Sequence, residues 1–266
     1  MSEINVQAVA DYLHSIAPNA YQEAYDNSGL LVGSYSDSVK GILISLDVTE
    51  SVISEAVKMG CNLIVSHHPI IFSGLKRLTD QNYIQRCVKM AIKHDVNLFA
   101  IHTNLDNVYD HGVNTNIARI LGLSDVEILR AKPEVGEEKV GSGIIGKIAS
   151  MEEHAFLEYL KTKMAVSCVK HTALLGQPIE KVAVCGGSGR FLLEDAKALG
   201  ADIFISSDFK YHEFFDADGQ IVIADIGHYE SEQHTTKMLQ ALLKTKFSTF
   251  AAHCTKVNTN PVNYLV

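Results

Sequence analysis

The sequence has few cysteines, a deficit of positive charge and no apolar run of the eighteen or more residues that a membrane-spanning helix needs. Its five cysteines are scattered, form no C-x-x-C pair and are odd in number, which argues against a disulfide framework. The first residues, Met1 to Asn5, have neither the basic nor the apolar segment of an export signal. These absences predict a reduced, cytoplasmic protein that does not enter a membrane.

Positive charge is scarce as well. Lys and Arg number 23 against 31 Asp and Glu, so the net charge is -8 and the pI is near 5.8. Because binding to a nucleic-acid backbone needs clustered basic residues, no broad nucleic-acid surface is expected. A small-molecule substrate, held in a local pocket, remains compatible with this balance.

The chain is long and apolar enough to form a full core. It has 266 residues, of which 47% are hydrophobic and 20% charged, a composition that suits one large domain or two lobes. Helical spacing and caps alternate with buried strand patterns through the first half, which predicts parallel strands with right-handed crossovers. The expected elements are helices over 5–17, 50–59, 81–94 and 113–121, and strands over 41–48, 61–65 and 96–101.

The second half repeats part of the first. The segment 60–66 is echoed by 200–206, each after an amphipathic helix and with the same order of apolar positions. A later strand pattern covers 221–226. We therefore predict an α/β fold of two similar lobes with mainly parallel sheets. The expected division is a first lobe over 1–124, a connector with strands and a helix over 125–180, and a second lobe over 181–266.

Histidines and carboxylates follow several of these strands. Parallel strands end at the same edge of a sheet, where open α/β folds bind their ligands. The candidates are His67, His68, His102, Asp106, His228 and Glu232. Four imidazoles and two carboxylates exceed the three protein ligands of an open zinc site and suit two ions, which predicts a dinuclear metal site in the cleft between the two lobes. Zinc, iron, manganese and cobalt all accept such ligands, and His102 is expected to support the ligands rather than bind metal itself.

Three further segments carry weaker signals. The turn formers at 25–30 favour a surface turn. The glycine-rich stretch 185–189 can cradle an anion with its amides or form a plain tight turn. Ser206 to Asp208 can orient a ligand or substrate, or cap the next helix.

Four segments in this order resemble the successive motifs of the NGG-interacting-factor-three-like family, whose bacterial members are called GTP cyclohydrolase 1 type 2 homologues. They are 25–30 (YDNSGL), 66–76 (SHHPIIFSGLK), 102–106 (HTNLD) and 227–232 (GHYESE). The resemblance implies two α/β lobes, a dinuclear metal site and a ring-shaped homo-oligomer, usually a hexamer. It also implies that His67, His68, Asp106, His228 and Glu232 are the metal ligands and that His102 lines the site. Tyr25 replaces a common Trp, Ser206-Ser207 replaces Thr-Gly, and a large middle insertion is absent.

These observations predict a metal-dependent hydrolase, by resemblance a GTP cyclohydrolase. A hydroxide bridging two divalent ions would attack an electrophilic carbon such as C8 of guanine, with Glu232 or Asp106 as the bridging carboxylate. His102 or His212 would transfer protons. No residues are assigned to an organic cofactor. Hydrolysis of an amide or a phosphoester is an alternative, and so is a non-enzymatic metal-binding scaffold on which a partner protein docks.

Overall fold

The computed structural model describes residues 4–248 and 250–265, so Met1 to Glu3 of the N-terminal prediction lie outside the described residues. The chain forms two compact units. Unit 1 comprises Met1–Leu105 and Thr235–Pro261, and unit 2 comprises Asp106–His234 and Val262–Val266. This division differs from the expected sequential lobes because the chain returns to unit 1, where its last strand joins the first sheet. No helix of the described chain is long and apolar enough to cross a membrane.

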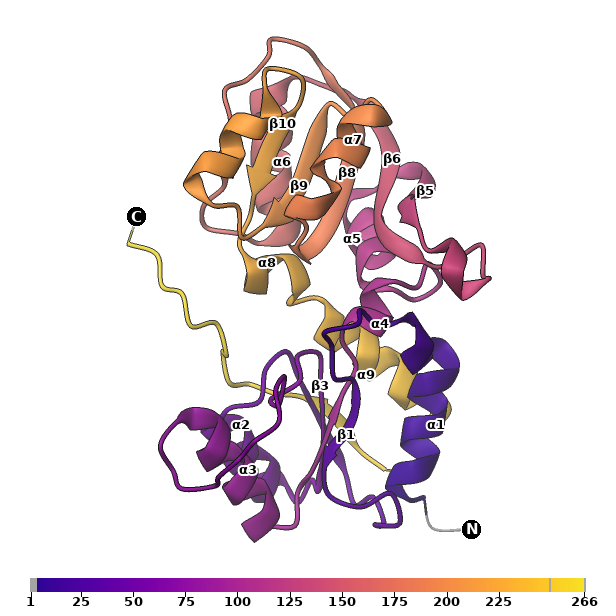
Figure 1. Cartoon of the computed structure of the whole chain (residues 1–266), viewed down its shortest axis with the longest axis vertical. Helices are drawn as coiled ribbons and strands as arrows, with labels where there is room; N and C mark the ends of the chain where they lie inside the picture. Colours follow the sequence, from indigo (N-terminus) through magenta and orange to yellow (C-terminus); the bar gives the residue numbers. More distant parts are fainter. Residues whose placement is uncertain (1–3, 249, 266) are drawn as a thin grey trace. The chain divides into compact units, whose positions relative to one another are not determined.

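Unit 1 is built on a five-stranded sheet of order β1-β4-β3-β2-β11. Its strands are β1 (Gly29–Val32), β2 (Ile42–Ser45), β3 (Leu63–Ser66), β4 (Asn97–Ala100) and β11 (Ala252–Cys254). All neighbouring pairs are parallel except β1 with β4. The helical elements are α1 (Val6–Ile16), η1 (Asn19–Tyr21), α2 (Glu50–Met59), α3 (Tyr83–Lys93), α4 (Thr103–Asp106), whose last residue belongs to unit 2, and α9 (Thr235–Lys246) (Figure 1).

The core of unit 1 explains why its central strands read as apolar runs. Every residue of β2, β3 and β4 is buried, as is usual for parallel strands covered on both faces. Helices α2 and α3 pack one face of the sheet, and α2 is defined by sequence signals at both ends. The Thr49 hydroxyl accepts a hydrogen bond from the Val52 amide, and Gly60 ends the helix in the left-handed conformation.

Unit 2 is built on a six-stranded sheet of order β5-β6-β8-β9-β10-β7. Its strands are β5 (Ser124–Ala131), β6 (Gly141–Met151), β7 (Lys170–His171), β8 (Ile179–Ser188), β9 (Ile203–Ser207) and β10 (Val222–Asp225). The helical elements are α5 (Val113–Leu121), η2 (Pro133–Val135), α6 (Glu153–Met164), η3 (Arg190–Leu192), α7 (Leu193–Ala198), η4 (Tyr211–Ala217) and α8 (His228–Glu232) (Figure 1).

The α/β class with two sheets is confirmed, but only the first sheet is mainly parallel. In unit 2 the parallel pairs are β8 with β9 and β9 with β10, while β5, β6 and β7 pair antiparallel. The reason is that the segment expected as a connector, 125–180, supplies a long hairpin and an edge strand to the sheet. The echo segment 200–206 leads into β9 (Ile203–Ser207), which repeats the role of β3 as the sequence echo predicts.

One glycine fixes the position of β1 against β4. Gly33 has φ +113°, and a Cβ there would lie 1.8 Å from Oδ1 of Asn97, which accepts a hydrogen bond from the Ser34 amide at 2.9 Å. We expect Gly33→Ala to lower the free energy of unfolding by at least about 2 kcal/mol, because it adds backbone strain and a clash.

The matched control is Gly60→Ala, which has a positive φ of +71° but open space around the added carbon. It should lower the free energy of unfolding by only about 1 kcal/mol in urea titrations of both variants. Equal losses would contradict the assignment of Gly33 to a steric role.

Candidate metal centre

Three imidazoles meet at the carboxyl ends of β3 and β4 in unit 1. The parallel register pairs Ser66 with Ala100, so His67 and His68 after β3 lie beside His102 after β4. Their ring centroids are 5.0 to 5.3 Å apart, and one nitrogen from each lies within 4.8 Å of the others. The adjacent histidines His67 and His68 thus share one side of the chain, because strand β3 ends at Ser66 and the chain turns after it.

Each of these rings is held by an oxygen atom on its Nδ1. The pairs are His67 with the Ile101 carbonyl at 2.9 Å, His68 with Oδ1 of Asp47 at 2.7 Å, and His102 with Oδ1 of Asp26 at 2.7 Å. Carbonyl and carboxylate oxygens only accept hydrogen bonds, so Nδ1 carries the proton in each ring. The lone pair is left on Nε2, which is the arrangement found in metal-binding histidines.

Asp26 is a functional residue that the turn interpretation of 25–30 missed. Its side chain is fully buried although Tyr25 beside it is exposed. The carboxylate accepts hydrogen bonds from His102, from the amide and hydroxyl of Thr103, from the Asn27 amide and from the Ser28 hydroxyl. Burial raises the pKa of Asp26, but these hydrogen bonds outweigh it and hold the pKa well below the usual carboxyl range.

Unit 2 carries a histidine held in the same way. Nδ1 of His228 lies 2.7 Å from Oδ2 of Asp208, and its Nε2 lies 3.2 Å from Oε2 of Glu232, one helical turn along α8. Glu232 is buried. Burial lowers the pKa of His228, but the hydrogen bonds to Asp208 and Glu232 outweigh it and raise the pKa to about 11. A divalent cation held by His228 and Glu232 would take the place of that proton.

The structure decides the role of Asp208. It follows β9 with φ +61°, a conformation that is costly for a residue with a side chain, and its carboxylate receives the hydrogen bond of His228. That hydrogen bond also lowers the pKa of Asp208. Asp208 therefore orients a histidine, while Lys210 takes the position that caps η4.

The glycine-rich stretch 185–189 binds groups of this chain through its amides and makes room for the Glu232 carboxylate. The prediction that it binds an external anion is therefore wrong. The Gly187 amide donates to Ser231, the Gly186 amide donates to Asn114, and the Gly189 amide donates to Ser206. A Cβ on Gly187 would lie 2.4 Å from Oε1 of Glu232. The stretch is the end of strand β8, and its missing side chains leave room for Glu232.

Asp106 faces the same region of unit 2. Burial raises the pKa of the Cys185 thiol, and the negative charges of Asp106 and Glu232 raise it further. Asn114 donates to the Asp106 carbonyl at 3.0 Å and accepts from the Gly186 amide at 2.8 Å. The carboxylates of Asp106 and Glu232 therefore both lie close enough to the Cys185 thiol to raise its pKa.

His212 is placed differently from the other candidates. It lies on η4, is exposed, and packs its ring against Tyr211 and Phe215 at centroid distances of 5.1 and 6.3 Å. His212 is linked to the metal-ligand candidates only through the sequence, because η4 begins shortly after Asp208.

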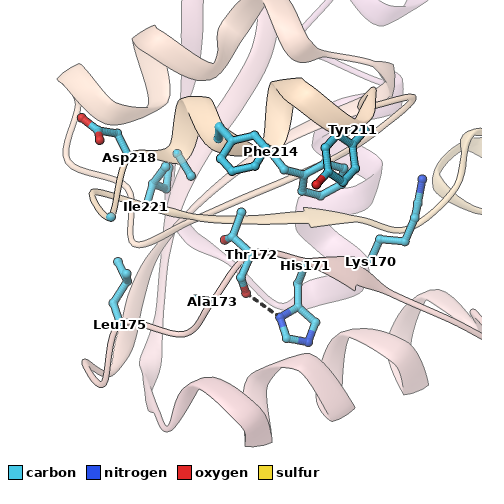
Figure 2. A pocket seen from close by; sticks show the side chains of 12 residues that line it. Lys170, His171, Thr172, Ala173, Leu175, Tyr211, Phe214, Asp218 and Ile221 are labelled. Carbon is cyan, nitrogen blue, oxygen red and sulfur yellow. Dashed lines mark hydrogen bonds between the residues drawn. The ribbon is translucent and has the colours of Figure 1, made fainter.

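A separate apolar pocket of about 650 Å³ lies between η4 and the segment that follows β7. Figure 2 shows Tyr211 and Phe214 along one side of it, with Thr172 and Leu175 across from them, while His171 turns away and its Nδ1 contacts the Thr172 carbonyl at 2.7 Å. The ammonium of Lys170, at one end, is paired with buried Asp225 at 2.7 Å. The lining therefore favours an uncharged, apolar group.

Both units thus carry groups with the chemistry of metal ligands. Unit 1 offers three imidazoles, and unit 2 offers His228 with Glu232 and Asp106. Such nitrogen and oxygen donors suit divalent zinc, iron, manganese or cobalt. The chain is therefore an α/β protein of two sheets with histidine and carboxylate groups that can hold metal ions.

Comparison with known proteins identifies its family. Residues 4–261 match the model of the Duf34/NIF3 (NGG1p interacting factor 3) family, so the chain belongs to it and the resemblance read from the sequence is confirmed. A Clostridium perfringens protein named GTP cyclohydrolase 1 type 2 homolog is 35% identical over 225 residues, which cover 84% of this chain and 85% of that protein.

Two further relatives agree with this assignment. A Campylobacter jejuni protein of the same name is 32% identical over 242 residues, covering 91% of this chain and 92% of that protein. The crystal structure of a Staphylococcus aureus hypothetical protein superposes with a TM-score of 0.91 at 28% identity, covering 99% of this chain and 100% of that chain.

The hydrogen bonds of Asp26 generate a prediction about stability. We expect Asp26→Asn to lower the free energy of unfolding by about 2–4 kcal/mol at pH 7. The asparagine NH₂ group would point at hydrogen-bond donors that now bind a carboxylate oxygen, and those donors would lose their acceptor. Folding lowers the pKa of Asp26, so its contribution is complete above about pH 4 and is lost as the pH falls further.

Urea unfolding of the wild type and the variant at pH 7 and pH 3.5 measures this. The difference between them should shrink at the lower pH. Exposed Asp95→Asn is the control and should change stability by less than about 0.5 kcal/mol. An Asp26 variant as stable as the wild type at pH 7 would rule out this role.

Proposed function

We propose that the protein is a dinuclear-metal-dependent hydrolase whose metal ligands are His67, His68, Asp106, His228 and Glu232. The observation that carries the proposal is the common state of the histidines. In His67, His68, His102 and His228 the Nδ1 atom contacts an oxygen acceptor at 2.7 to 2.9 Å. One such contact is common in any protein, but four of them leave four Nε2 atoms suited to metal binding.

The donor set supports two ions rather than one. An open tetrahedral zinc site takes three protein ligands, and this chain offers more imidazoles and carboxylates than that. Two ions accommodate them with a carboxylate shared between the metals, and Glu232 and Asp106 are the candidates for that role. When bound, two divalent ions activate water and stabilise negative charge that develops on a substrate.

We assign His102 and His212 to proton transfer. Nδ1 of His102 donates its proton in a hydrogen bond to Asp26, so Nε2 is the atom that can take up or release a proton. Asp26 holds the ring in that orientation and stabilises its positive charge. His212 is the second candidate, because it lies four residues after Asp208.

For the substrate we propose a purine nucleotide such as GTP. The support is the printed name of the relatives, GTP cyclohydrolase 1 type 2 homolog. Hydrolysis would open the guanine ring at C8 and release formate. We further propose that the protein acts in the cytoplasm as a ring-shaped homohexamer, which follows from the family resemblance.

Elemental analysis tests the metal ligands. We expect the purified protein to contain two divalent ions per chain, and His68→Ala and Glu232→Ala each to lose at least one, because each removes a donor atom. His94→Ala, which changes an exposed histidine at the end of α3, should keep both ions. Undiminished metal content in both ligand variants would refute the site.

Incubation with GTP tests the reaction. The metal-loaded protein should release formate, a chelator should abolish the release, and His102→Ala should lower kcat by at least about 10²-fold, the usual contribution of a general acid or base. Absence of formate and of any changed nucleotide would exclude the cyclohydrolase. Turnover of an amide or phosphoester would then identify another hydrolase, and inactivity on all three would favour the scaffold.

A further inference from the structure

The segment after β11 crosses the end of strand β2. Strand β11 pairs parallel with β2, and the pairing continues when the Thr255 amide donates to the Ile44 carbonyl at 2.8 Å. Residues 255–261 then follow without regular secondary structure. This course brings the segment to Asp47, two residues beyond β2, whose carboxylate holds His68.

This segment is fixed before it reaches Asp47. Glu55 of α2 accepts hydrogen bonds from the Thr255 hydroxyl and from the Lys256 amide. Val257 packs against the core between the sheet and helices α2 and α3. Two polar contacts and one apolar contact therefore anchor the segment to unit 1 independently of Asp47.

The anchored segment delivers one hydroxyl to Asp47. Oγ1 of Thr259 donates to Oδ2 of Asp47 at 2.7 Å, while Oδ1 of the same carboxylate accepts the Nδ1 proton of His68 at 2.7 Å. The Asp47 side chain is 33% exposed, so water competes for its oxygens. Because Thr259 occupies one oxygen, rotation of the carboxylate away from His68 breaks two hydrogen bonds instead of one.

We propose that Thr259 is a positioning residue that fixes the Asp47 carboxylate and, through it, the orientation and Nδ1-protonated form of His68. The inference rests on the proposed function only in calling His68 a metal ligand. The Thr259, Asp47 and His68 side chains form a continuous chain of hydrogen bonds within unit 1. Partners that hold a ligand histidine change metal affinity when removed, typically by 10- to 100-fold.

The same segment contains a matched control. Thr255 also donates its hydroxyl to a carboxylate, but its acceptor Glu55 lies on α2, away from the histidines. Thr255→Val and Thr259→Val remove the same atom and keep nearly the same shape. A merely structural role predicts the same effect from both variants, whereas a positioning role predicts an effect on His68 from Thr259→Val alone.

Two measurements test the proposal. Nitrogen-15 NMR of the metal-free protein reports which ring nitrogen of His68 is protonated, and competition of Zn²⁺ between the protein and a chelator reports metal affinity. We expect Thr259→Val to shift the ring-nitrogen signals of His68 and to weaken Zn²⁺ binding by about 10-fold or more. Thr259→Ser, which restores the hydroxyl, should recover both values, and Thr255→Val should change neither.

The contrary results are distinct. Unchanged His68 signals and unchanged Zn²⁺ affinity in Thr259→Val would overturn the proposal, and so would equal changes in Thr255→Val. If the wild-type protein binds no Zn²⁺, Mn²⁺, Co²⁺ or Fe²⁺, the proposed function fails. The NMR signals of the metal-free variants then decide alone whether Thr259 orients His68.

Discussion

The hydrogen bond between a histidine Nδ1 and an oxygen acceptor is the interaction on which the candidate site depends. It recurs at His67, His68, His102 and His228, with acceptors from four different segments. An imidazole that turns freely presents either nitrogen, in either protonation state, and so binds a cation weakly. Fixing the proton on Nδ1 selects one donor atom per ring and sets its direction. The carboxylates of Asp26, Asp47 and Asp208 therefore contribute to the candidate site by orienting its histidines.

Each unit places its own histidines and carboxylates side by side by a different means. In unit 1 the parallel register of β3 and β4 ends both strands at one level, so the histidines that follow are neighbours. In unit 2 the α8 helix presents His228 and Glu232 on one face, and the bare backbone at Gly187 admits the buried carboxylate.

Sequence reasoning located the histidines and carboxylates of the candidate site and offered Asp208 as a residue that orients a ligand, but it missed Asp26 and Asp47, which hold two of the histidines. His67, His68 and His102 were found because each follows an apolar strand. Asp47 lies at the end of such a strand too, which was the available signal, but its partner is 21 residues away. Asp26 was missed because it lies in a run of turn-forming residues. The composition of such a run predicts a turn but not the burial of one of its side chains. The strands between 125 and 180 were expected but assigned to a connector, because hairpin strands with exposed faces have weak apolar patterns that do not reveal their pairing with the second sheet.

The sequence by itself determined the α/β class, most strands and helices, the family, and the set of candidate donor residues. These features follow from local periodicity, capping residues and motif order, all of which depend on residues that are close to one another in the sequence. Only the tertiary structure decided that the chain returns to unit 1 at Thr235, that 125–180 completes a sheet, and that Thr259 reaches Asp47. The contact between Thr259 and Asp47, which are 212 positions apart, leaves no periodic trace, because it depends on how the sheet pairs and where the segment after β11 packs.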